Sequence, residues 1–296
     1  MKIGIMGIPR FMEALQAQLQ NAGIESKKIP FSKVKAPFKM LDIDIIHCFY
    51  MPESTKFFKL AKILGKKTVL HWIGSDVLRV ITDPGRREKA LKTTKYVDLN
   101  MALSPWLKEE LETLGIKSHV IPALPKNADF NVVSFPEQFT VLGYLPVFRH
   151  EFYGSEIIFK LAKEYPQIKF IIVTSAGKGE GKDVFPSIPN LEYRGYIKNM
   201  SVLYDEVTVL VRIPEHDGQS IMVLEALAKG RHVIYKYAFP GCQKAVDYQE
   251  VKDIIDRMLK KTELNIEGSE YIKKEFNEKV VTENIINLYK GLLSDK

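Results

Sequence analysis

The chain has 296 residues, 46% of them hydrophobic and 27% charged, and its apolar runs fall short of the roughly 20 residues that cross a bilayer. This composition excludes disordered, fibrous and membrane-spanning proteins and favours about two globular domains. The net charge of +7 favours an anionic partner, such as nucleotide phosphate, nucleic acid or anionic lipid.

The first residues and the two cysteines bear on the compartment. The segment MKIGIMGIPRF lacks the layout of a signal peptide, and we interpret it as a first β-strand. Cys48 and Cys242 lie far apart and follow no metal or redox spacing, which fits a reducing environment. We therefore expect a cytoplasmic protein.

Short apolar segments alternate with helical patterns in the first half of the chain. Strands are predicted at 2–8, 42–49 and 67–74, and helices at about 11–21 and 52–65. Nearly continuous apolar strands are typical of buried parallel sheets whose crossover helices are right-handed. We predict a first α/β domain over residues 1–125.

The segment PKNADFNVVSFPEQ breaks this periodicity, and we interpret residues 126–138 as a linker. A second series then begins with strands at 139–145, 168–175, 191–196, 207–213 and 231–237. We predict a second α/β domain over 139–275 and a C-terminal helix, 276–296, that returns to the first domain. Two facing Rossmann-like domains with parallel sheets and a central cleft are the expected architecture.

The segment EHDGQSIMVLEALAKG (215–230) carries the strongest signal for chemistry. A strand ends before it and a helix begins near Ser220, so Asp217, Gly218 and Gln219 fall where open α/β sheets bind ligands. The helix N-terminus favours a phosphate, and glycine permits close backbone approach. Asp217 and Glu225 flank that position and suit hydroxyls on both sides of a diphosphate, as in a nucleotide-sugar. An ordinary amphipathic helix with a capping acid is the alternative.

This stretch resembles the E-x7-E signature of retaining GT-B glycosyltransferases, in particular family four. The resemblance extends over TVLGYLPVFRHEFYG, NLEYRGYIKNMSVLYDEVTVLVRI and the closing helices, and in the first half over TVLHWIGSDV and LNMALSPWLKEELETLGIKSHVIPAL. It implies an α/β GT-B fold and transfer of a sugar from a nucleotide-sugar to a hydroxyl acceptor. It also implies retention of the anomeric configuration, no cofactor and no metal.

The resemblance also implies site residues. His71 would lie near the reaction centre, Asp217 would contact the donor sugar and Glu225 would hold the ribose. A packed structural histidine is the alternative for His71. The donor-binding set that we predict is Gly218, Gln219, Ser220, Glu225, Arg194, Tyr196, Thr174 and Gly7.

Two departures from the family pattern affect catalysis. Asp217 stands where the signature usually has Glu. Tyr144 and Tyr153 lie near the places of an Arg and a Lys that usually neutralise the diphosphate. We predict that Arg149 supplies this charge, with Arg212 and Arg194 as alternatives, and loss of such cations would cost about 3–4 kcal/mol if nothing replaced them.

Lysines interleave with apolar residues at 27–40 and 54–67. Solvated lysine faces on packed helices explain this pattern, and peripheral contact with the inner face of a membrane, with a lipid-linked acceptor, is the alternative. We predict a hexosyltransferase-type enzyme that does not bind nucleic acid. The rival is a catalytically silent nucleotide-sugar or glycan-binding protein of the same fold.

Overall fold

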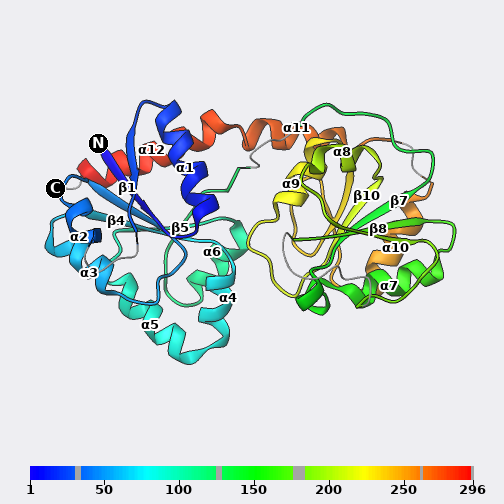
Figure 1. Cartoon of the computed structure of the whole chain (residues 1–296), viewed down its shortest axis with the longest axis horizontal. Helices are drawn as coiled ribbons and strands as arrows, with labels where there is room; N and C mark the ends of the chain where they lie inside the picture. The colour runs from blue at the N-terminus through cyan, green and yellow to red at the C-terminus, as the bar shows by residue number, and fades with distance from the viewer. Residues whose placement is uncertain (31–34, 125–128, 176–183, 261–262, 295–296) are drawn as a thin grey trace. The chain divides into compact units, whose positions relative to one another are not determined.

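The computed structural model describes residues 1–30, 35–124, 129–175, 184–260 and 263–294 (Figure 1). The chain forms two compact units. Unit 1 contains residues 1–126, 216–219 and 276–296, and unit 2 contains 127–215 and 220–275. Among the described helices, none is long and apolar enough to cross a membrane.

Unit 1 is a parallel sheet with helices on both faces, and the strand order is β2-β1-β3-β4-β5-β6. Its strands are β1 (Lys2–Met6), β2 (Glu25–Lys28), β3 (Ile45–Phe49), β4 (Lys67–Trp72), β5 (Leu99–Ala102) and β6 (His119–Val120). Its helices are α1 (Pro9–Asn21), α2 (Lys35–Met40), α3 (Lys56–Ile63), α4 (Ser75–Thr82), α5 (Pro84–Thr94), α6 (Pro105–Glu112) and α12 (Glu278–Ser294). α1 and α12 lie over one face of this sheet (Figure 1), where their apolar side chains share one core cluster.

Unit 2 repeats this plan with the strand order β12-β11-β10-β7-β8-β9. Its strands are β7 (Thr140–Tyr144), β8 (Lys169–Thr174), β9 (Leu191–Tyr196), β10 (Val209–Arg212), β11 (His232–Tyr235) and β12 (Gln243–Lys244). Its helices are α7 (Ser155–Glu164), α8 (Met200–Asp205), α9 (Ile221–Ala228), α10 (Tyr248–Met258) and α11 (Ile266–Glu275), with short 3-10 turns η1 (Val147–Arg149) and η2 (Glu151–Tyr153). α7 and α10 pack into the core on one face of the sheet.

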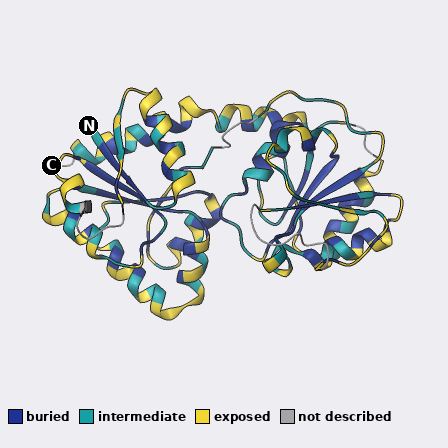
Figure 2. Ribbon diagram, in the orientation of Figure 1, coloured by how far each residue is buried: buried dark blue, intermediate teal, exposed yellow. Residues whose placement is uncertain are grey.

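The central strands of both sheets are buried over all or nearly all of their length, whereas the helices expose one side (Figure 2). β3 and β10, for example, have no residue that is not buried. Because helices cover both faces of a parallel sheet, such strands are apolar throughout rather than alternating. The predicted α/β class with two parallel sheets is confirmed.

Each sheet contains one point where the strand order reverses. In unit 1 the chain pairs β1 with β2 on one side and with β3 on the other. In unit 2 it pairs β7 with β8 on one side and with β10 on the other. Loops diverge at such a switch point and leave room for a ligand beyond the carboxyl ends of the strands.

A buried hydrogen bond fixes α12 on unit 1. The Tyr289 hydroxyl on α12 lies 2.6 Å from Nδ1 of His47 on β3, and both side chains are fully buried. The C-terminal helix therefore packs on the sheet through a polar contact as well as through Val281 and Ile285.

Replacing Tyr289 with Phe should test this contact. The variant keeps the ring but leaves a buried His47 nitrogen without its donor, so the free energy of unfolding should fall by about 1–3 kcal/mol. Urea denaturation of Tyr289→Phe and of Tyr96→Phe, a half-buried tyrosine of the same unit, provides the comparison. Equal stabilities for the two variants would contradict this role.

Candidate donor site in unit 2

Three side chains meet at the switch point of unit 2. Arg212 is the last residue of β10, Tyr144 is the last residue of β7 and Tyr153 ends the η2 turn. The guanidinium carbon of Arg212 lies 5.0 Å from the ring centre of Tyr144 and 4.8 Å from that of Tyr153. The two tyrosine rings contact each other edge to face, with centres 5.1 Å apart.

Burial gives the Arg212 charge a strong local effect. Arg212 is only 8% exposed, and an arginine guanidinium carries its positive charge inside proteins as well as on their surfaces. A guanidinium is planar, so it stacks on aromatic faces and forms paired hydrogen bonds to phosphate oxygens, whereas a lysine ammonium lacks this planar geometry. The family pattern places an Arg and a Lys near the positions of Tyr144 and Tyr153. In this chain the rings of these two tyrosines flank the guanidinium of Arg212 instead.

Glu225 lies on α9, the helix that follows β10. The Tyr204 hydroxyl donates to its Oε2 across 3.1 Å and lies 3.3 Å from the carbonyl oxygen of Met222. Burial raises the pKa of Glu225, and the hydrogen bond from Tyr204 opposes this rise. Burial also raises the pKa of Tyr204 well above its usual range, Glu225 raises it further and Arg212 lowers it. The charges of Glu225 and Arg212 thus both act on the Tyr204 hydroxyl.

The first turn of α9 begins at Ser220, which is buried and makes no side-chain capping bond. α9 ends before Gly230, whose φ of 69° makes it a left-handed helix terminus. At the start of α7, a Cβ at Gly154 would lie 2.7 Å from the Ile213 carbonyl oxygen, so the chain before α7 packs directly against the end of β10. The start of α7 and the end of β10 therefore lie together at this switch point.

The loop residues 216–219 belong to unit 1. The Trp106 indole donates to the Asp217 carbonyl oxygen across 2.7 Å, and the Ala123 amide donates to Gln219 Oε1 across 2.7 Å. A Cβ at Gly218 would lie 2.0 Å from the Ile73 carbonyl oxygen. Only glycine fits at 218, because any side chain there would overlap the backbone of residues 73–74. From the sequence alone, this glycine is instead interpreted as a point where the backbone approaches a ligand.

His71 is a buried residue near the carboxyl end of β4. It is 2% exposed, its Nδ1 lies 3.2 Å from His47 Nε2 and its Nε2 lies 2.9 Å from the Ile121 carbonyl oxygen. If each ring is neutral, Tyr289 donates to His47, His47 to His71 and His71 to Ile121, and every nitrogen has a partner. Both nitrogens of His71 have partners inside unit 1, as the structural alternative for this histidine expects, and its place near the reaction centre stays a prediction.

The remaining predicted residues lie on separate elements. Arg149, on η1, is exposed, and its guanidinium carbon lies 3.7 Å from the centre of the Phe152 ring. Arg194, on β9, is paired with Glu192 and Glu206, which already balance its charge. Thr174 ends β8, Tyr196 ends β9 with 56% of its surface exposed, and Gly7 follows β1 in unit 1. Their donor-binding roles stay predictions.

Two structural residues carried little sequence signal. Asp76 accepts backbone amides of Met51, Ile73, Gly74 and Val77, and so joins the chain ends of β3 and β4. Its position after Gly-Ser is compatible with a turn but does not reveal the contact with Met51. Tyr204 occupies a helix that reads as ordinary core, and only the structure shows its hydroxyl on Glu225.

Comparisons with known proteins show the fold. No family model and no curated protein matches the chain. Among solved structures, a glycosyltransferase from Rickettsia africae aligns with a TM-score of 0.78 at 13% identity, covering 100% of this chain and 99% of that one. Sucrose-phosphate synthase from Thermosynechococcus elongatus aligns with a TM-score of 0.76 at 14% identity, covering 100% of both chains.

HepE from Anabaena, solved in complex with UDP, aligns with a TM-score of 0.76 at 13% identity, covering 98% of this chain and 100% of HepE. A further HepE structure contains UDP-glucose and aligns with a TM-score of 0.73. At these identities the likeness concerns the fold. The chain therefore has the GT-B fold, built from two Rossmann-like units, and its assignment to family four stays a prediction.

The buried histidines of unit 1 predict a pH dependence of stability. Burial lowers the pKa of His71 from 6.5 to about 4 and lowers that of His47 well below its usual range. Unfolding exposes both rings, so the unfolded chain takes up protons below pH 6.5 that the folded chain does not bind. Stability present above pH 6.5 should be lost progressively as the pH falls towards 4.

Thermal unfolding at pH 7 and pH 5 measures this loss. The His47→Gln variant should lose less stability than the parent over this interval, because one titrating ring is gone. His119→Gln, at an exposed position, should behave like the parent. A pH dependence in His47→Gln as steep as in the parent would show that the buried rings do not cause it.

Proposed function

We propose that the protein is a glycosyltransferase that moves a sugar from a nucleotide-sugar donor to a hydroxyl acceptor. The observation that carries this proposal is that a buried cation, Arg212, and a half-buried carboxylate, Glu225, both act on the Tyr204 hydroxyl, with Arg212 at the switch point of unit 2 and Glu225 on the helix that follows β10. A nucleotide-sugar presents a diphosphate to the cation and ribose hydroxyls to the carboxylate. The HepE complexes with UDP and UDP-glucose support this choice of ligand class.

In this proposal the diphosphate lies between Arg212 and the first turn of α9. Free amides at a helix N-terminus and the helix dipole favour a phosphate, and a nearby guanidinium adds charge-assisted hydrogen bonds. Tyr204 holds the Glu225 carboxylate in place, so that its other oxygen accepts from ribose hydroxyls. Ser220 contributes to diphosphate binding because it stands at the start of α9.

The chemical step breaks the bond between the anomeric carbon and the diphosphate oxygen, the acceptor hydroxyl oxygen forms the new bond, and its proton passes to the departing diphosphate. Negative charge then grows on the departing diphosphate, and a fixed cation beside it lowers the barrier. Arg212 is our candidate for this role in place of Arg149, because it is buried at the switch point whereas Arg149 is exposed. Retention of configuration, a hexose as the sugar, and transfer without a metal ion are parts of this proposal, and Asp217 remains our candidate contact to the sugar.

The second candidate is a protein that binds a nucleotide-sugar without transferring it. Tyr144 and Tyr153 favour this candidate, since each provides a ring where the family pattern provides a cation. Incubation with labelled UDP-, GDP- and ADP-sugars separates the two, because an enzyme hydrolyses its donor slowly even without acceptor. Binding with no product over many hours would favour the second candidate.

Replacing Glu225 with Gln tests the ribose contact. Because burial raises the pKa of Glu225, its ionised form costs stability at neutral pH, and the neutral amide removes that cost. We expect a melting temperature of the free variant no lower than that of the parent, together with loss of the rise that UDP produces. Glu250→Gln, at an exposed position in unit 2, should keep the UDP-dependent rise. An undiminished rise in Glu225→Gln would contradict the assignment.

Replacing Arg212 with Met tests the diphosphate contact. Met keeps most of the buried volume but removes the charge, so kcat/KM for donor hydrolysis should fall by about 100- to 1000-fold. Arg257→Met, at an exposed position on α10, is the matched control and should keep full activity. If Arg149→Met loses the activity and Arg212→Met does not, the charge comes from Arg149.

A further inference from the structure

Unit 1 contains an apolar cavity of about 400 Å³ at its own switch point. The segments after β1 and β3 form it, and its lining includes Gly7, Ile8, Phe49, Tyr50, Met51 and Phe57. The lining is almost entirely apolar. A volume of this size is within the range of about 300–1000 Å³ that is usual for small-molecule sites.

The backbone of the cavity wall is held in an uncommon conformation. Tyr50 has φ of 75°, the only positive φ of a non-glycine residue in the described chain. Its amide donates to the His71 carbonyl oxygen across 3.0 Å, and the next amide, of Met51, donates to Asp76 Oδ2 across 3.0 Å. Such strain persists only where neighbouring contacts fix it, and it concentrates at ligand sites. The conformation of the cavity wall is therefore fixed by specific hydrogen bonds and is not simply a gap between packed elements.

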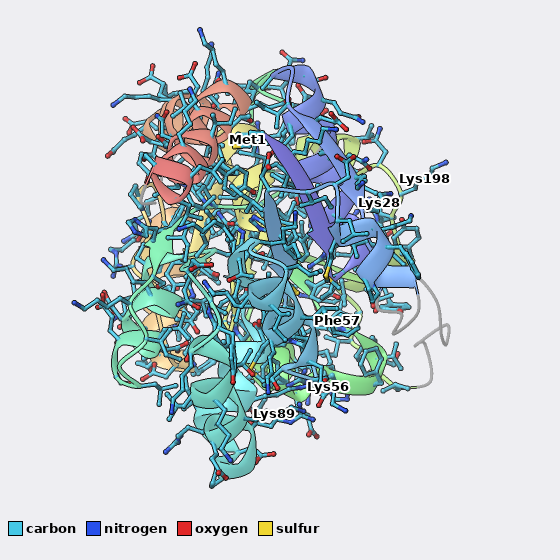
Figure 3. All side chains as sticks on the ribbon, turned by 90° about the vertical axis from the view of Figure 1, so that its left-hand side faces the viewer. Met1, Lys28, Lys56, Phe57, Lys89 and Lys198 are labelled. Atoms are coloured by element: carbon cyan, nitrogen blue, oxygen red, sulfur yellow. The ribbon has the colours of Figure 1, made fainter. Side chains whose placement is uncertain are left out.

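A second hollow, of about 580 Å³, adjoins this cavity through Glu53 and Ser54, which line both. It lies between α3 and α5, and Figure 3 labels Phe57, Lys56 and Lys89 on these two helices. We call it the lysine groove, because its lining includes Lys56, Lys59, Lys89, Lys92 and Lys95.

The lysine groove carries an excess of positive charge. Glu53 pairs with Lys89 and with Arg86, and Glu88 pairs with Lys92. Hydrogen bonds from Arg86 and Lys89 lower the pKa of Glu53 to about 2, so Glu53 is ionised at neutral pH and its negative charge offsets the charges of these two partners. Within the part of the chain that the structure describes, the ammonium groups of Lys56, Lys59 and Lys95 have no carboxylate partner. They are the cations available to an anionic ligand.

We propose that unit 1 binds a single lipid molecule that carries a phosphate or diphosphate. Its hydrocarbon chain occupies the apolar cavity, and its anionic group lies in the lysine groove on Lys56, Lys59 and Lys95. Neither hollow alone selects this ligand, because the cavity lining has no cation for the phosphate and the groove lining consists mainly of charged side chains. Resting on the proposed function, this lipid also carries the hydroxyl group whose oxygen accepts the sugar.

Binding of soluble alkyl phosphates below their micelle concentrations tests the proposal. In isothermal titration, dodecyl phosphate should bind more tightly than decyl phosphate by at least about tenfold, because two methylenes enter the cavity. Dodecyl glucoside, which has the chain without the charge, should bind more weakly than dodecyl phosphate. Inorganic phosphate alone should bind weakly.

Two variants separate the cavity from the groove. The triple variant Lys56→Gln, Lys59→Gln, Lys95→Gln should weaken dodecyl phosphate at least tenfold and preserve the dependence on chain length. Ile8→Trp should fill the cavity and abolish that dependence. Melting curves establish that each variant is folded. The matched control Lys39→Gln, Lys117→Gln, Lys290→Gln removes equal charge from exposed positions of unit 1 and should bind like the parent.

Equal weakening by both triple variants, or affinity independent of chain length in the parent, would overturn the proposal. So would binding to anionic vesicles without binding of monomeric alkyl phosphate, since that result indicates a membrane surface rather than a single lipid. The UDP-dependent melting shift distinguishes the two sites. Its absence in a parent that binds alkyl phosphate would refute the donor proposal and leave the lipid site standing.

Discussion

A parallel sheet with right-handed crossovers leaves room at its carboxyl edge only where the strand order reverses. Both units of this chain obey that constraint, and their candidate sites lie at the reversals, between β7 and β10 in unit 2 and between β1 and β3 in unit 1. The two edges differ in chemistry. The first combines a guanidinium, two tyrosine rings and a carboxylate, and the second combines apolar side chains with neighbouring lysines. One fold thus presents two surfaces suited to different ligands.

In our proposal, Arg212 keeps the electrostatic function of the donor site although the sequence pattern of that site has changed. The family pattern places cations on the segment after β7, and this chain has Tyr144 and Tyr153 there. Because β10 pairs directly with β7, a cation at the end of β10 lies beside those tyrosines. The two tyrosine rings attract the guanidinium and restrict the motion of its side chain. A flexible lysine in water would have no such restriction. In our proposal a single preorganised guanidinium, aided by the start of α9, replaces a pair of basic residues.

Sequence reasoning predicted the parallel strands and the helix of Glu225, because continuous apolar runs and the strand–loop–helix order depend on local pattern. It did not predict β2, β5, β6 or β12, which are short; β2 (Glu25–Lys28), for example, is a polar strand at the edge of its sheet and lacks a continuous apolar run. It placed His71 correctly in a strand, but hydrogen bonds from residues 24 and 50 positions away decide what its nitrogens do. Gly218 was identified as a point of close approach, and only coordinates reveal that the approach is to Ile73. Local pattern specifies elements, whereas long-range contacts specify roles.

Amide hydrogen exchange with and without UDP tests the central claim, that a nucleotide diphosphate binds where the sheet of unit 2 reverses. The account predicts slower exchange for the first turn of α9 and for the segment 145–154 after β7, in the parent protein but not in Arg212→Met. Protection confined to other parts of the chain, or identical protection in that variant, would contradict it.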